Sequence, residues 1–279
     1  MNRHKQESKR SFLSERSAQG QRPWVLGHRG ASHDCPENTL LAFQEALRQG
    51  ADGVELDVMR CGSGEVVVVH DDDLARLSGP VGAGVEVRRT PLSVLRRYDV
   101  GQGQHIPTLD EVLEAMGDEP LVNIELKTEA LYTTLDYARL LVDDGLADAV
   151  FAVLVRSGRL GDSGTTLVSS FDPFQLRRFW KASRGQFPLG FLFEARQSAW
   201  TRSLYRLPLL RLHAIHPQAR ALDAPSMRAW REKGLRVNTW TVDDPREVAC
   251  AATLGVDGII TNRPAQTLSV LRTDWGNKE

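Results

Sequence analysis

An imidazole, a guanidinium group and a glycine stand side by side at His28, Arg29 and Gly30, directly after a short apolar run. The histidine can transfer a proton near neutral pH, the arginine can hold two phosphate oxygens, and the glycine lets a ligand approach the backbone closely. A second histidine, His70, follows the apolar run VVVV. If both runs end at one place, one ring can accept a proton while the other donates one. This arrangement predicts acid–base chemistry on an anionic substrate.

Two further segments carry charged residues at a spacing of two. Side chains two apart on a strand point the same way, so Glu55 and Asp57 in GVELDV face one side together. Glu125 and Lys127 have the same spacing in VNIELK. Converging carboxylates need a compensating cation, and ligation by oxygen alone favours a hard divalent metal over zinc. We therefore expect Glu55, Asp57 and Glu125 to hold one divalent ion, Mg²⁺ or Ca²⁺. The alternative, a solvent-facing edge strand, is disfavoured by the second pair.

Three residues at the ends of apolar runs are predicted to bind substrate. Arg29 offers a fork for two phosphate oxygens and Lys127 offers a compact positive charge. Trp240 can provide an apolar wall, although a tryptophan of the core is the alternative. Glu37 and Asn38 precede an expected helix, and capping that helix and bracing Arg29 account for them without a ligand role.

Short β-branched runs that alternate with helical patterns position these residues. Parallel strands are expected at 24–28, 53–58, 122–127, 166–171, 188–193, 214–217, 237–242 and 258–261. Helices are expected at 36–50, 109–116, 173–183, 225–233 and 245–254. Eight strand–helix units predict an α/β fold, a (β/α)₈ TIM barrel whose active site lies at the carboxyl ends of the strands.

The VVVV run follows the second strand after only the loop CGSGE. A parallel neighbour would need a longer crossover, and the glycines of the loop indicate a hairpin. The second strand would therefore pass the barrel mouth and the next run would return to it, which brings His70 to the same end as His28. The glycine-rich residues 75–106 are expected to form a small insertion over the active-site end.

The bulk composition limits the possible partners. The chain has 279 residues, 25% of them charged, and a formal net charge of −1, which disfavours nucleic acid or an anionic membrane as the main partner. Residues 1–22 are polar and mostly basic, and we expect a disordered extension there, followed by one barrel domain at 23–279. The longest apolar run, 149–155, is too short to cross a bilayer. Three scattered cysteines without metal-ligand spacing predict reduced thiols and a cytoplasmic location.

Taken in order, the motifs resemble those of the glycerophosphodiester phosphodiesterase family. They are HRG at 28–30, PENT at 36–39, ELD at 55–57, the histidine of VVVVHD, IPTLDEVL at 106–113, IELK at 124–127, SSFDP at 169–173, WTVDD at 240–244 and GVDGIITNRP at 255–264. The resemblance covers nearly all of 25–264. It implies that His28 and His70 match the acid and base.

The same resemblance implies that Glu55, Asp57 and Glu125 match the metal ligands, while Arg29 and Lys127 match the phosphate contacts. Two departures from the family pattern are visible. Asn262 stands where the family usually has an aspartate, and MRCGSGE replaces the usual threonine and aspartate after the second strand. Neither departure replaces a catalytic residue type, so both bear on substrate range more than on activity.

The activity implied by the resemblance is metal-dependent hydrolysis of glycerophosphodiesters such as glycerophosphocholine. The products are sn-glycerol 3-phosphate and an alcohol, which places the reaction in lipid and glycerol metabolism. One alternative is a lysophospholipase D, for which residues 198–212 could make a weak contact with a membrane surface. The other is a non-catalytic glycerophosphodiester-binding protein, which the complete set of site residues disfavours. The residues leave open whether water attacks directly or a cyclic phosphate forms first, and they carry no signal for the oligomeric state.

Overall fold

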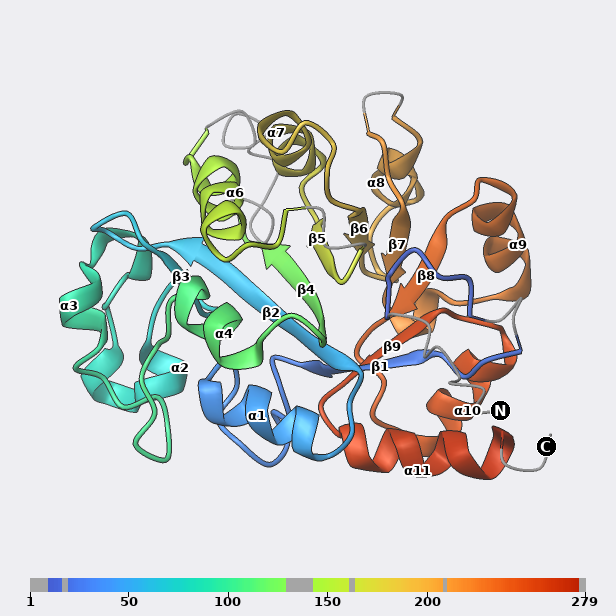
Figure 1. Cartoon of the computed structure of the whole chain (residues 1–279), viewed down its shortest axis with the longest axis horizontal. Coiled ribbons are helices and arrows are strands. Elements are labelled where there is room, and N and C mark those ends of the chain that lie inside the picture. The colour runs from blue at the N-terminus through green and yellow to red at the C-terminus, as the bar shows by residue number, and fades with distance from the viewer. Residues whose placement is uncertain (1–9, 17–19, 129–142, 161–163, 208–209, 276–279) are drawn as a thin grey trace, which may run out of the picture.

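A computed structural model of the chain shows a closed barrel of parallel strands surrounded by helices (Figure 1). It describes residues 10–16, 20–128, 143–160, 164–207 and 210–275. The parallel strands are β1 (Trp24–His28), β2 (Gly53–Arg60), β4 (Leu121–Leu126), β5 (Thr166–Ser170), β6 (Leu189–Phe193), β7 (Ala214–Pro217), β8 (Arg236–Thr239) and β9 (Gly258–Thr261). β1 pairs with both β2 and β9, which closes the barrel. The predicted TIM barrel is confirmed.

Helices cover the outside of the barrel. The longer ones are α1 (Leu40–Arg48), α4 (Leu109–Met116), α6 (Leu146–Arg156), α7 (Pro173–Ala182), α9 (Ala224–Glu232), α10 (Pro245–Thr253) and α11 (Pro264–Trp275). Short helices are α2 (Ala75–Ser78), α3 (Leu92–Leu95) and α8 (Ala199–Arg202), with 3₁₀ turns at Gly79–Gly82, Val87–Arg89, Ser203–Arg206 and Ala219–Ala221. Side-chain caps fix several starts: Thr108 and Glu111 form a capping box at α4, and Asp172, Asp223 and Asp244 cap α7, α9 and α10.

β3 (Val66–Val68) is antiparallel to β2, with Val58 opposite Val68 and Arg60 opposite Val66. In Figure 1 the long β2 and the shorter β3 run out of the barrel toward α2 and α3. The predicted hairpin is confirmed. The chain after β3 returns toward the mouth, because Val69 donates its backbone N–H to the carbonyl of Asp57 at 3.0 Å. This return places His70 at the end of the barrel where β1 ends.

The segment after the hairpin packs on the protruding parts of β2 and β3. Its apolar side chains share one buried cluster with the two strands: Met59, Cys61, Val67, Val69, Leu74, Val87, Leu95, Val100 and Ile106. The cluster holds α2 and α3 at the outer end of β2. The insertion is therefore anchored on the hairpin by its own apolar contacts.

The opposite end of the barrel is closed by side chains, including one from the N-terminal extension. Phe12 is 3% exposed and packs with Trp24, Leu26 and other inward-facing residues. The guanidinium of Arg16 stacks on the Trp24 ring, 3.6 Å from its centroid. The prediction of disorder is therefore wrong for residues 10–16, because an aromatic and a stacked arginine bury the apolar floor of the barrel. Residues 1–9 and 17–19 of that prediction lie outside the described part.

Within the described residues, the helices are all too short or too polar to cross a membrane. Cys35, Cys61 and Cys250 are free thiols.

We expect Phe12→Ala to lower the free energy of unfolding by about 3 kcal/mol, because it opens a cavity in the floor of the barrel. For a chain of this length that corresponds to a melting temperature lower by roughly 5 °C. The matched control is Leu13→Ala, because Leu13 is 45% exposed and should change stability little. Scanning calorimetry measures both. Equal melting temperatures for the two variants would show that the extension contributes nothing to the floor.

Candidate active site

Three carboxylates converge at the mouth because β2 and β4 are parallel neighbours. Asp57 lies opposite Glu125 in the register, and Glu55 precedes Asp57 by two residues on the same face. All three side chains are buried, with exposed fractions of 8% or less. One oxygen of each lies within 4.8 Å of the others. The sequence prediction that these residues come together is confirmed by this geometry.

Two cations balance part of this negative charge. Arg29 Nε lies 3.0 Å from Asp57 Oδ2, and Lys127 Nζ lies 3.0 Å from Glu125 Oε1 and 3.5 Å from Asp57 Oδ1. Burial alone would raise the pKa of Asp57, but Arg29 and Lys127 outweigh it and hold the pKa well below its usual range. Burial, together with the charges of Asp57 and Glu125, raises the pKa of Glu55. Three carboxylates thus face two cations, and their mutual repulsion is part of what raises the pKa of Glu55.

The three carboxylates fit a hard divalent cation. Glu55 Oε1 is buried without a hydrogen-bond partner, so it has a lone pair available for a ligand. The donor set consists of oxygens alone, which Mg²⁺ and Ca²⁺ prefer. A bound cation would also relieve the repulsion that raises the pKa of Glu55. The charge, donor type and spacing of the three carboxylates therefore all fit a bound Mg²⁺ or Ca²⁺ ion.

His28 ends β1 with its ring held by an amide. Its Nδ1 lies 2.7 Å from Asn262 Oδ1, while Asn262 Nδ2 donates to Asp243 Oδ2 at 2.6 Å. Because the amide nitrogen is used by Asp243, the amide oxygen must accept, so Nδ1 of His28 carries the proton. Nε2 lies on the other side, 3.9 Å from Glu55 Oε2. Burial, with help from Arg29, lowers the pKa of His28 to about 4, so the ring is neutral at neutral pH.

His70 is held by the residue that follows it. Its Nδ1 lies 2.6 Å from Asp71 Oδ1, which leaves Nε2 for a ligand. His70 and His28 line one cavity of about 200 Å³ together with Arg29, Glu55 and Lys127. The hairpin thus brings the two predicted histidines to the same mouth.

Apart from Glu194, the remaining wall of this cavity is apolar. It is lined by Phe171, Leu192 and Trp240, and Glu194 also contributes. The rings of Phe171 and Trp240 meet edge to face, with centroids 5.5 Å apart. Trp240 Nε1 donates to the carbonyl of His216 at 2.8 Å, which fixes the ring at the mouth. Trp240 therefore lies where the sequence predicts a wall for substrate.

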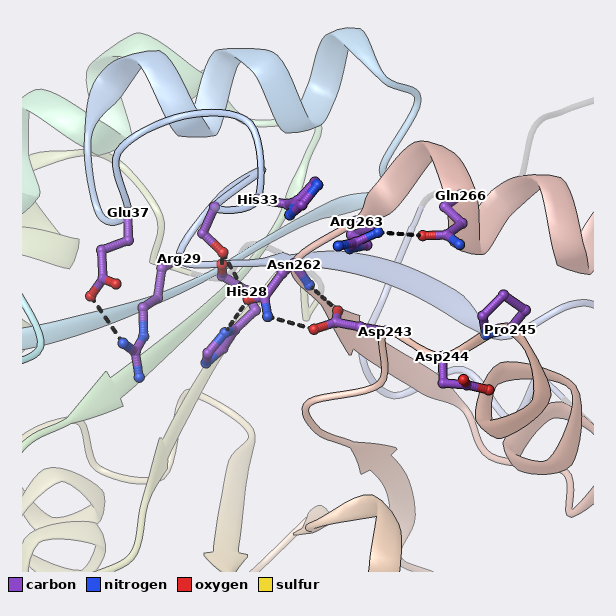
Figure 2. A pocket seen from close by; sticks show the side chains of 11 residues that line it. His28, Arg29, His33, Glu37, Asp243, Asp244, Pro245, Asn262, Arg263 and Gln266 are labelled. Atoms are coloured by element: carbon purple, nitrogen blue, oxygen red, sulfur yellow. Dashed lines mark hydrogen bonds and ion pairs between the residues drawn. The ribbon is translucent and has the colours of Figure 1, made fainter. Parts of the chain in front are cut away.

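A second hollow of about 590 Å³ lies on the Asn262 side of His28 (Figure 2). Figure 2 shows His28, Asn262 and Asp243 joined in one line of hydrogen bonds, with Arg29 and Glu37 paired beside them. Its lining is polar, in contrast to the wall beside Trp240. His28 and Arg29 border both spaces.

The turn after β1 stores backbone strain. Arg29 and Asn38 have backbone φ angles of 55° and 57°, in a region that residues other than glycine rarely adopt. Arg29 N–H donates to Glu55 Oε2 at 3.1 Å, and Asn38 Nδ2 donates to Asp57 Oδ2 at 2.9 Å. A Cβ on Gly30 would lie 2.5 Å from the backbone of α1, so only glycine lets this turn pack so closely.

The structure corrects one prediction and adds residues to the site. Glu37 braces Arg29 as expected, at 2.9 Å, but the cap of α1 is Thr39 and Asn38 instead binds the carboxylate of Asp57. From the sequence Asn262 is recognisable only as a missing charge, and its bond to His28 has no local signal because the two residues are 234 positions apart. Asp71 could have been found from its place directly after His70.

A model of the Glycerophosphoryl diester phosphodiesterase family matches residues 28–266 of the chain. Over 258 residues the chain is 30% identical to a glycerophosphodiester phosphodiesterase of Caldanaerobacter subterraneus subsp. tengcongensis, with 89% of this chain and 97% of the relative covered. The chain belongs to the glycerophosphoryl diester phosphodiesterase family.

Solved structures resemble this phosphodiesterase over most of its length. A phosphodiesterase of Oleispira antarctica, solved in complex with the product sn-glycerol-3-phosphate, has a TM-score of 0.73 at 29% identity and covers 90% of this chain and 97% of its own. A glycerophosphodiester phosphodiesterase of Thermotoga maritima has a TM-score of 0.68 at 31% identity and covers 89% of this chain and 98% of its own. The fold and the family are thus shared along nearly the whole barrel.

For this phosphodiesterase we expect Lys127→Ala to destabilise the metal-free protein by about 3–5 kcal/mol, because it leaves buried carboxylates without their cation. Addition of Mg²⁺ or Ca²⁺ should restore part of the lost stability, since a divalent ion replaces the missing charge. Thermal melts in EDTA and in each metal measure both effects. The matched control is Arg156→Ala, which removes an exposed ion pair with Asp110 and should have little effect. A loss no larger than that of the control would contradict the buried network.

Proposed function

We propose that this phosphodiesterase hydrolyses glycerophosphodiesters to sn-glycerol 3-phosphate and an alcohol with the help of one divalent ion, Mg²⁺ or Ca²⁺. The observation that carries the proposal is the single cavity that His28, His70 and Lys127 share with the carboxylates of Glu55 and Glu125. Family membership supports the reaction class. The product bound in the Oleispira antarctica phosphodiesterase supports the identity of the product.

The phosphate would bind beside the two cations. Lys127 offers its ammonium group at the mouth, and Arg29 offers Nη2, because its Nη1 and Nε already contact Glu37 and Asp57. The glycerol carbons would lie against Trp240, whose ring faces the same cavity. The phosphodiester would then lie between His28 and His70.

Glu55, Asp57 and Glu125 would hold the metal. When bound there, a divalent ion supplies a Lewis acid that neutralises the phosphate charge and lowers the pKa of a nearby hydroxyl group. The chain's own residues then move the protons. The ion pairs of Asp57 keep this carboxylate ionised and in place throughout.

His28 would accept the proton of the attacking hydroxyl group. Its ring is neutral, its Nδ1 proton is held by Asn262, and Nε2 faces the mouth beside Glu55. As the new P–O bond forms and the bond to the leaving alcohol breaks, His70 in its doubly protonated form would donate its Nε2 proton to the leaving oxygen, while Asp71 holds its Nδ1 proton. The attacker is either water or the neighbouring glycerol hydroxyl, which would give a cyclic phosphate that is then hydrolysed.

One observation favours lysolipids as a second class of substrate. Trp200 on α8 is 60% exposed, and Leu207 follows at 37%, both within the stretch 198–212 that could contact a membrane surface. Residues 208–209 of that stretch lie outside the described part. A lysophospholipase D would release its product from lysolipid micelles, whereas the principal proposal predicts preference for glycerophosphocholine and glycerophosphoethanolamine. A turnover assay on both classes separates them.

The free thiols support a reducing compartment such as the cytoplasm.

Dialysis against EDTA should abolish turnover of glycerophosphocholine, because the phosphate charge then lacks its main counter-charge. Added Mg²⁺ or Ca²⁺ should restore the activity. Circular dichroism should show the barrel intact in EDTA, since the apolar layers lie beneath the carboxylates. Full turnover in excess chelator would remove the metal from the proposal.

His28→Ala and His70→Ala should each reduce kcat on the order of 10²–10⁴-fold, the usual contribution of a general acid or base. The double variant should lose far less than the product of both factors, because the two residues act in one proton transfer. Protonation of His28 blocks the base, so the wild-type rate should rise with pH through its lowered pKa of about 4. His28→Ala should lose this acidic limb. Strictly multiplicative losses in the double variant would contradict a shared step.

A further inference from the structure

One arginine of the insertion, Arg76, forms ion pairs with two separate loops at the mouth. Arg76 on α2 donates from Nε to Asp71 Oδ2 at 2.5 Å. Its two terminal nitrogens donate to both oxygens of Glu37, at 2.8 and 2.7 Å. Glu37 precedes α1 and Asp71 follows the hairpin, so one planar guanidinium joins the two connections.

Each of these carboxylates has a second partner inside the mouth. Asp71 Oδ1 holds Nδ1 of His70 at 2.6 Å. Glu37 Oε1 accepts a hydrogen bond from Arg29 Nη1 at 2.9 Å. Arg76 therefore contacts the orienting carboxylate of a proton-transfer residue and that of a phosphate-binding residue at the same time.

The positive charge of Arg76 helps to keep both carboxylates ionised. Burial alone would raise the pKa of Glu37, but Arg76 and Arg29 outweigh it and lower the pKa. For Asp71, His70 and Arg76 likewise overcome burial and lower the pKa to about 2. Both groups thus stay ionised at working pH and can each accept two hydrogen bonds. Without Arg76 the two carboxylates would lose their common cation.

We propose that Arg76 is a positioning residue that fixes the ring of His70 and the guanidinium of Arg29 in one arrangement for the reaction. The inference rests on the proposed function, because the groups that Arg76 positions are those assigned to proton transfer and phosphate binding. Its side chain is 50% exposed and is not part of the mouth lining. Arg76 therefore acts through Asp71 and Glu37, and its removal should cost little stability.

The test compares Arg76→Gln, which keeps most of the side chain but removes the charge, with Arg76→Lys. The matched control is Arg96→Gln in the same insertion, because Arg96 is 43% exposed and pairs with Glu111 at the start of α4. Residues that orient site groups usually contribute 10–100-fold, so we expect Arg76→Gln to lower kcat on the order of 10–100-fold at nearly unchanged melting temperature. The kcat of Arg76→Lys should fall between those of the wild type and Arg76→Gln, since an ammonium group keeps the charge but cannot bind both carboxylates as a guanidinium does. The control should stay within about twofold of wild type.

A readout without turnover separates this proposal from the proposed function. ¹⁵N spectra of the histidine rings show which nitrogen of His70 carries the proton. When the His70 ring is neutral, we expect its one proton to be fixed on Nδ1 in the wild type and in Arg96→Gln, and to be distributed over both tautomers in Arg76→Gln. If the wild type hydrolyses no glycerophosphodiester but Arg76→Gln still mixes the tautomers, the proposed function fails and the positioning stands. Wild-type kcat together with a wild-type His70 spectrum in Arg76→Gln would overturn the positioning role.

Discussion

Asp57 lies at the mouth end of β2 with 1% of its surface exposed, and its two oxygens face cations from different strands. Arg29 comes from the turn after β1 and Lys127 from the end of β4, at 3.0 and 3.5 Å. A buried carboxylate without such partners would cost several kcal/mol. The neighbouring β1, β2 and β4 must therefore keep their register, since a shift by one residue would turn Asp57 away from both cations.

The same constraint explains the unusual backbone around the mouth. Arg29 and Asn38 occupy left-handed conformations, and both contact carboxylates of β2. Strain of this kind persists only where the surrounding contacts compensate for it. Here the compensation comes from Asp57 and Glu55, so the turn that carries the histidine and the strand that carries the carboxylates stabilise each other.

Much of the architecture could be predicted from the sequence because it depends on local patterns. The strand runs, the β2–β3 hairpin with its loop CGSGE and the extent of α4 follow from periodicity and loop length. The sequence does not predict α6, because its core AVFAVLV is apolar throughout and has no helical period. The burial of Phe12 cannot be predicted either, because a single aromatic residue in a basic segment forms no pattern.

In the candidate site, too, local sequence patterns predict some features and carry no signal for others. Strand spacing alone predicts that Glu55 and Asp57 point the same way, and the hairpin predicts the place of His70. The residues that hold the rings come from distant segments, as with Asn262, and no local spacing reveals them. Asp71 can be suspected from its place next to His70, but the contact with Arg76 that also holds Asp71 depends on the packed insertion.

The closure of the barrel has a consequence for how the chain folds. β1 pairs with β9, and the backbone N–H of Arg16 donates to Asp257, 241 residues along the chain. A growing chain leaves the ribosome from its N-terminus, so β1 lacks its second neighbour until all the other strands of the barrel have been made. Contacts of such sequence separation have a high loop-closure entropy and slow folding. Until then the apolar edge of β1 and the ring of Phe12 are exposed to other chains, and this interval is when the protein is most prone to aggregation.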